Sequence, residues 1–392
     1  MDNKYIYSED GKKIIYIGEK TVTSYTAPYD LRAGGFFESS AFKSPSTVYI
    51  PKGTAAIDPH AFEGSRKLKH VFIPNSVRQM GAGAFRKCTG LVSVQIGKGL
   101  TVREKSMFYG CSSLTRVVLP SNLTSIGPFA FSECTKLESI TIPDGVKIID
   151  EYAFAGCTSL KKIIIPSSVV KIDERAFKNC TRLESVTFST SVPAIRAATF
   201  QNCSSLKSVD MPDSVVQICE FAFQGCSALE HVILPPNLES IDTSAFSNCS
   251  SLIEIRIPSD VTWIGYRAFE GCTRMKRVTF DTDELDGIGT AAFHNCTSLE
   301  EITLPKGMTH LGDAVFYGCK SLKTVTMPME METIGACAFM DCQSLESVHF
   351  PCGVEIEEDA FKGCTRLESV CLEGPAGCTT IQVNKNGTIS IV

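Results

Sequence analysis

Thirteen of the eighteen cysteines recur at one position of a regular spacing, so thiol chemistry is the first chemistry to weigh. The Cα atoms of equivalent cysteines in stacked repeats would lie about 4.8 Å apart, within disulfide range, but their Cβ atoms would point the same way, which disfavours disulfides. No C-x-x-C pair is present to favour a tetrahedral zinc site. We therefore interpret these residues as small buried hydrophobes, whose abundance favours a reducing or anaerobic setting. They are Cys88, Cys111, Cys134, Cys157, Cys180, Cys203, Cys226, Cys249, Cys272, Cys296, Cys319, Cys342 and Cys364.

One acidic turn could bind a cation. The residues before Gly287 resemble a calcium-binding loop, but the closing bidentate glutamate is missing. A solvated turn is the favoured interpretation, and a calcium site stays the alternative. The carboxylates are Asp281, Asp283, Glu284 and Asp286.

Motifs for catalysis are not found. The sequence has no phosphate-binding G-x-x-x-x-G-K-[ST], no nucleophile elbow G-x-S-x-G and no H-E-x-x-H zinc motif. The six histidines are dispersed along the chain, so no catalytic pairing is suggested. We therefore predict that the protein is not an enzyme and holds no cofactor or metal.

The cysteines belong to a repeat that occupies most of the chain. Each follows a phenylalanine by three residues, and this phenylalanine recurs every 23 residues from Phe62 to Phe269, then with slips of one residue. Fourteen copies are present: Phe62, Phe85, Phe108, Phe131, Phe154, Phe177, Phe200, Phe223, Phe246, Phe269, Phe293, Phe316, Phe339 and Phe361.

One repeat predicts a short strand, a turn and a return path. After Phe154, the alternation of Ile163 and Ile165 is typical of a strand with one buried face, and Pro166 ends it. Val169 and Ile172 then form a second apolar pair. A single coil cannot bury these residues alone, so they are expected to stack on their equivalents in neighbouring coils.

The run L-x-x-I-x-I-P-x-x-V-x-x-I-x-x-x-A-F-x-x-C resembles the BspA-like (Treponema-type) leucine-rich repeat over residues 41–372. The resemblance implies an α/β-type repeat solenoid. It would be a curved, right-handed superhelix of about 14 coils with short parallel strands on the concave face and irregular or helical turns on the convex face. The coil that begins at Phe85 departs from this pattern, with Gly97 in place of the proline and Arg103 in place of an inward isoleucine.

Three regions are expected on this basis. Residues 1–40 would form an N-terminal cap with a hairpin around Asp10-Gly11, and residues 41–372 the solenoid. Residues 373–392 would form a C-terminal capping hairpin around Asn386-Gly387.

Charged residues gather on neighbouring strands of the predicted concave face. They could recognise a protein, or they could simply pair with one another, with Arg277 lying between Glu254 and Glu301. Both interpretations stay open. The candidate binding residues are His231, Glu254, Arg256, Arg277 and Glu301.

Aromatic platforms for a sugar are scarce in the pattern. Only Phe72 and His349 are expected on the concave strands, while Trp263 and Tyr266 on the return path could be exposed or could cover the convex side.

Composition narrows the partners. A net charge of −5 and a pI near 5.8 leave no basic stripe for nucleic acid or an anionic membrane. The first residues show no signal-peptide pattern, and no apolar run is long enough to span a bilayer. The family resemblance implies a cell-surface or secreted location, with the cytoplasm as the alternative.

The predicted function is therefore a non-enzymatic protein-interaction scaffold. The resemblance implies a bacterial, adhesin-like protein that binds host or microbial proteins through its concave face. Two alternatives remain, a carbohydrate-binding module with a glycan as the partner and an intracellular interaction or regulatory scaffold.

Overall fold

The computed structural model describes residues 5–7, 13–15, 46–101, 104–189, 191–374 and 377–382. The chain divides into two compact units, Met1–Thr190 (unit 1) and Ser191–Val392 (unit 2). The described ranges contain strands and turns and no helix. It follows that these residues include no helix of the length and apolarity that a bilayer crossing needs.

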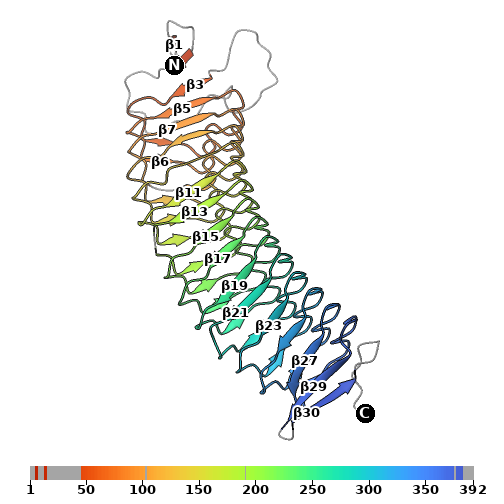
Figure 1. Cartoon of the computed structure of the whole chain (residues 1–392). Coiled ribbons are helices and arrows are strands. Elements are labelled where there is room, and N and C mark those ends of the chain that lie inside the picture. Colours follow the sequence, from red (N-terminus) through yellow and green to blue (C-terminus); the bar gives the residue numbers. More distant parts are fainter. Residues whose placement is uncertain are drawn as a thin grey trace. The chain divides into compact units, whose positions relative to one another are not determined.

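The longer strands of each unit stack in parallel, as Figure 1 shows, and we call their outward surface the front face. The described front strands of unit 1 are β3 (Thr47–Tyr49), β5 (His70–Ile73), β7 (Ser93–Ile96), β8 (Arg116–Val118), β11 (Lys162–Ile165) and β13 (Ser185–Phe188). Those of unit 2 are β15 (Ser208–Asp210), β17 (His231–Ile233), β19 (Glu254–Ile257), β21 (Arg277–Phe280), β23 (Glu301–Thr303), β25 (Thr324–Thr326), β27 (Ser347–Pro351) and β29 (Ser369–Gly374).

The strands pair in a register that places residues one repeat apart beside each other. Ile163 lies beside Val186, and Ile255 lies beside Val278, so equivalent residues of successive coils are neighbours. Inward residues are buried and the residues between them are exposed, as in β19, where Ile255 and Ile257 are buried and Glu254 and Arg256 are not. The predicted short parallel strands with one buried face are confirmed.

A second parallel row, which we call the side row, lies on the return path. Each of its strands has only two residues, because one inward aliphatic residue per coil anchors it. In unit 1 they are β4 (Ala56–Ile57), β6 (Gln79–Met80), β9 (Ser125–Ile126), β10 (Ile148–Ile149) and β12 (Lys171–Ile172). In unit 2 they are β14 (Ala194–Ile195), β16 (Gln217–Ile218), β18 (Ser240–Ile241), β20 (Trp263–Ile264), β22 (Gly287–Ile288), β24 (His310–Leu311), β26 (Thr333–Ile334) and β28 (Glu355–Ile356).

Each repeat phenylalanine lies in a turn, the Phe turn, that also bonds coil to coil. Phe223 N–H donates to Ala245 O at 2.8 Å, and Phe246 N–H donates to Ala268 O at 2.8 Å. The residues two before and two after each phenylalanine have positive φ, for example 58° at Phe221 and 73° at Gly225. This left-handed backbone turns alternate N–H groups toward the next coil, so the turn side is ordered although it is not helical.

The core is a stacked column of aromatic rings beside aliphatic rows. Rings of Phe85 and Phe108 in unit 1 lie 5.5 Å apart between centroids, and those of Phe246 and Phe269 in unit 2 lie 5.4 Å apart and 1° from parallel. All four phenylalanines are fully buried. The predicted solenoid of about fourteen coils is therefore built by stacking like on like.

The chain ends carry antiparallel pairs. β1 (Tyr5–Tyr7) pairs with β2 (Lys13–Ile15) on either side of Asp10-Gly11, and β29 pairs with β30 (Gly377–Gln382). Asn386-Gly387, where the sequence predicted the C-terminal turn, lies outside the described residues. That residues 1–40 and 373–392 act as caps stays a prediction.

Candidate functional site

The five predicted binding residues lie together on the front face of unit 2. The parallel register places Glu254 beside Arg277 and Arg277 beside Glu301. Arg256 lies two residues along β19 from Glu254, on the same exposed side, and His231 is exposed at the start of β17. The strand alternation therefore points all five side chains away from the core, as the sequence predicted.

Two ion pairs cross this surface. Arg277 Nη1 lies 3.4 Å from Glu254 Oε2, and both side chains are more than half exposed. Glu301 forms no ion pair among the residues that the structure describes. The charge ladder considered from the sequence, in which Arg277 contacts both glutamates, thus reduces to one pair.

The second pair was not predicted. Arg256 Nε donates to both carboxylate oxygens of Asp281, at 2.9 and 2.7 Å. Asp281 belongs to the acidic turn, for which only a solvated turn and a calcium loop were considered. One sign of this pair was present in the sequence: an aspartate stands at the position where the neighbouring coils have proline.

A second carboxylate of the acidic turn also forms an ion pair. Asp283 Oδ2 lies 3.6 Å from Lys306 Nζ. Among the described residues, no cluster of three or more His, Cys, Asp or Glu side chains has the arrangement of a metal site.

A hollow of about 680 Å³ lies beside three of the predicted residues, Glu254, Arg256 and Arg277. Its wall includes Ile233 and Pro236 on one side and Arg256, Arg277 and Asp281 on the other. β17 ends one sheet and β19 begins the next, so the hollow spans a division in the front row of unit 2. Ile233 was not among the predicted site residues. The structure shows it to be 76% exposed.

A smaller hollow of about 290 Å³ shares a wall with the first. Arg277 lines both, and Glu301 and Lys306 line the smaller one. Four of the predicted residues, Glu254, Arg256, Arg277 and Glu301, therefore border a continuous stretch of surface from β19 to β23, whereas His231 lines neither hollow.

The repeat cysteines have a different role. All thirteen are buried and none is in a disulfide, as predicted. Thiols of this row also donate to the carbonyl of the phenylalanine one coil back, for example Cys249 Sγ to Phe223 O at 3.3 Å and Cys272 Sγ to Phe246 O at 3.3 Å. Cys371, which is not a repeat position, is disulfide-bonded.

Burial makes these thiols poor nucleophiles. It raises the pKa of Cys226, Cys272 and Cys319 to about 12. A thiol with such a pKa stays protonated at neutral pH, and the thiolate is the reactive form. The cysteine row is therefore structural.

Both aromatic residues left open by the sequence are exposed. Trp263 is 45% exposed and Tyr266 is 40% exposed. The ring of Trp263 lies over Gly287 of the next coil, where a Cβ atom would come within 2.7 Å of it. The guanidinium of Arg267 lies 4.7 Å from the ring centre of Tyr266. On the front face of unit 1, Tyr49 stacks on Phe72 at 4.6 Å, a pair that the sequence pattern did not include.

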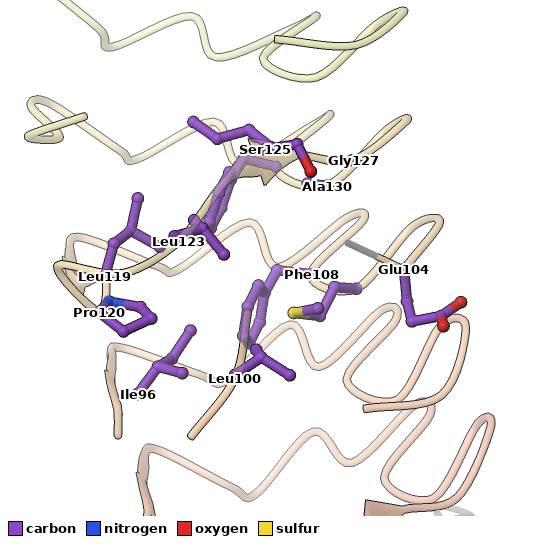
Figure 2. A pocket seen from close by; sticks show the side chains of 13 residues that line it. Ile96, Leu100, Glu104, Phe108, Leu119, Pro120, Leu123, Ser125, Gly127 and Ala130 are labelled. Carbon is purple, nitrogen blue, oxygen red and sulfur yellow. The ribbon is translucent and has the colours of Figure 1, made fainter. Parts of the chain in front are cut away.

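A small apolar cavity in unit 1 marks the irregular coil that begins at Phe85. Figure 2 shows Ile96, Leu100, Phe108 and Leu123 around it, with the carboxylate of Glu104 at its edge. Its volume of about 30 Å³ is close to that of one water molecule, too small for an organic ligand. Arg103, the predicted departure from the inward isoleucine, lies outside the described residues.

Comparison with known proteins identifies the repeat. The family model described as "BspA type Leucine rich repeat region (6 copies)" matches residues 35–161, 147–276 and 273–385. None of the curated proteins matches the chain.

Several solved structures resemble this chain. A leucine-rich repeat protein from Bacteroides ovatus ATCC 8483 is 28% identical, with a TM-score of 0.70, over 94% of this chain and 87% of that chain. A leucine rich cell surface protein from Faecalibacterium prausnitzii A2-165 is 25% identical, with a TM-score of 0.46, over 88% of this chain and 92% of that chain. The pneumococcal vaccine antigen PcpA is 18% identical, with a TM-score of 0.45, over 86% and 82% of the two chains.

The family model covers far more than half of the sequence, and its repeat coincides with the coils and Phe turns of both units. The chain belongs to the BspA-type leucine-rich repeat family.

Proposed function

We propose that the protein is a non-enzymatic interaction scaffold that binds a partner protein through the front face of unit 2. The observation that carries the proposal is the 680 Å³ hollow, which combines an exposed isoleucine with two exposed arginines. Interfaces between proteins commonly join an apolar centre to arginine and a polar rim. His231, Glu254, Arg256, Arg277 and Glu301 are the proposed contact residues.

The repeat architecture supports this function. A stack of coils gives a long, continuous row of exposed side chains that a large partner can contact at several positions. The proposal includes no catalysis. The thiols of the repeat cysteines are buried, and burial raises the pKa of Cys226 and Cys272 to about 12.

We further propose that the protein acts at the bacterial surface or after secretion, as an adhesin-like protein. The support is the BspA-type family assignment. Labelling intact native cells with a membrane-impermeant amine reagent checks it. Labelling that appears only after lysis would contradict a surface location, and finding the protein in neither the surface nor the medium fraction would contradict both.

Comparative capture tests the binding function. The intact chain and an Arg256→Glu/Arg277→Glu variant are immobilised, and proteins retained from candidate host and microbial extracts are quantified by mass spectrometry. A matched control reverses Arg116 and Lys162, which are exposed on front strands of unit 1.

The proposal expects at least one protein that the parent and the control retain equally and the unit 2 variant loses. Unfolding midpoints of all three chains exclude misfolding as the cause. Equal retention by all three chains would contradict a site at these arginines.

A further inference from the structure

The coil that begins at Phe269 breaks the repeat at the front-face turn. Its neighbours have Pro258 and Pro305 where this coil has Asp281. Proline has no N–H to donate, whereas Asp281 N–H donates to Ile257 O at 2.9 Å. The replacement therefore adds a backbone bond and places a carboxylate at the rim of the hollow.

That carboxylate fixes the orientation of Arg256. Asp281 accepts from Nε, at 2.7 and 2.9 Å, and among the described residues the two Nη groups of Arg256 have no acceptor, so their N–H donors are available. The Arg256 side chain is 76% exposed. A guanidinium held by Nε presents its Nη edge as a rigid donor group, which suits a carboxylate.

An apolar surface adjoins this edge. Ile233 projects from β17, one coil before Arg256, and is 76% exposed. Pro236 and Pro258 line the same hollow. Glu254 would repel an acidic ligand, but its partner Arg277 lies 3.4 Å away and offsets that charge.

We propose that the hollow binds an extended segment of the partner protein in which an acidic side chain and an aliphatic side chain are separated by one residue. The carboxylate accepts from the Nη groups of Arg256, and the aliphatic group packs on Ile233 and Pro258. In an extended chain such side chains lie on one face about 6.6 Å apart. Neighbouring strands are about 4.8 Å apart, so the two side chains can reach from β19 to β17. This inference rests on the proposed function and names the partner's chemistry.

The geometry also predicts how the segment is recognised. The pairs Arg256–Asp281 and Arg277–Glu254 leave the hollow with no net charge among these four residues. Recognition therefore depends on the directed donors of Arg256 rather than on long-range attraction, and Asp281 is a positioning residue.

The test begins with a display library of linear twelve-residue peptides selected on the intact chain. Enriched peptides are synthesised with an amidated C-terminus, and their dissociation constants are measured by fluorescence anisotropy. The proposal expects an acidic residue and an aliphatic residue at the stated spacing. Glu→Gln or Asp→Asn in the peptide should weaken binding at least tenfold.

Protein variants locate the contact. Arg256→Gln should weaken binding at least tenfold, and Ile233→Ser several-fold. Asp281→Asn should weaken it several-fold while the preference for an acidic peptide over its amide persists. Arg116→Gln, at an exposed front position of unit 1, should leave binding unchanged.

Several results would overturn the inference: no enrichment, enriched peptides without an acidic residue, binding that is lost on C-terminal amidation, or unchanged affinity in Arg256→Gln. If peptides depend on Arg277 or Glu301 but not on Arg256, the inference fails and the proposed function stands. If no peptide is enriched and comparative capture shows no difference, both fail.

Discussion

At the scale of single residues, the cysteine row shows why this side chain recurs. The Phe turn buries a backbone carbonyl, and the thiol of the next coil is a small apolar group that still donates to it. The sequence predicted burial correctly from spacing alone. It did not predict the hydrogen bond, because the direction of a thiol depends on how closely two coils stack.

Because their pKa is raised in the folded state, the thiols should make the free energy of unfolding fall as the pH rises above 9. The folded pKa of Cys226, Cys272 and Cys319 is about 12, above the ordinary 9.0, so their contribution is complete below pH 9 and is lost as pH rises toward 12. Each lowers the free energy of unfolding by about 1.4 kcal/mol per pH unit in that window. Urea unfolding between pH 8 and 11 measures the slope.

Lysine and tyrosine side chains also titrate in this pH range. A variant with Cys226, Cys272 and Cys319 replaced by alanine keeps those groups, so the difference between its slope and that of the parent isolates the three thiols. Its slope should be shallower by about 4 kcal/mol per pH unit, the sum for three thiols. Identical slopes in parent and variant would contradict the assigned pKa shifts.

The turn two residues after each phenylalanine makes a second residue-scale prediction. At Gly271, φ is 71°, and an added Cβ would lie 2.6 Å from Asn248 Oδ1 of the preceding coil. Gly271→Ala should therefore destabilise unit 2 by about 1–3 kcal/mol, from backbone strain together with this clash.

A double-mutant cycle with Asn248→Gly separates the two causes. Removing the asparagine side chain should relieve the clash, so that Gly271→Ala then costs only the backbone strain. Strictly additive effects in chemical unfolding would show that the side-chain contact is unimportant.

At the scale of elements, the front strands were predictable and the side row was not. Alternation at Ile163 and Ile165 has the period of a strand, whereas β12 has a single inward residue, Ile172, and too little sequence for a period. The division between β17 and β19 was also not predicted, because both coils match the repeat pattern.

The binding site was predicted in part for a similar reason. Strand alternation identified all five charged residues, but the Arg256–Asp281 pair depends on a turn that departs from the repeat. Ile233 resembled an ordinary strand residue in the sequence, and only its exposure distinguishes it.

Substitutions on the exposed side and on the buried side of the front strands should change the free energy of unfolding by different amounts. Arg277→Gln should lower the free energy of unfolding by less than about 1 kcal/mol, because its pair with Glu254 is well exposed. Ile255→Ala, in the neighbouring strand and buried, should cost about 2–5 kcal/mol. Comparable losses in urea unfolding would contradict the assignment of Arg277 to recognition rather than to stability.

At the scale of the whole molecule, stability is nearly one-dimensional. Each coil contacts its neighbours, so coils should be removable only as whole units. Deleting residues 316–338, one 23-residue coil of unit 2, joins Val315 to Phe339 in register. This variant should stay folded by circular dichroism and should keep the hollow.

Deleting only residues 316–327 is the matched control. It places strand residues against turn residues in every later contact, so cooperative unfolding should be lost or its midpoint should fall sharply. Equal behaviour of the two deletions would contradict coil-by-coil stacking.

The proposed function requires that unit 2 binds the partner through the hollow beside Ile233. Site-specific photocrosslinking tests it most directly, with a benzophenone amino acid in place of Ile233 in the intact chain and in place of Ile164 as the control. Both residues are exposed at the same strand position, 76% and 63%, in units 2 and 1 respectively. In the presence of the captured partner, we expect a crosslink from position 233 that Arg256→Gln weakens and none from position 164. A crosslink from position 164 alone, or equal crosslinking from both positions, would contradict it.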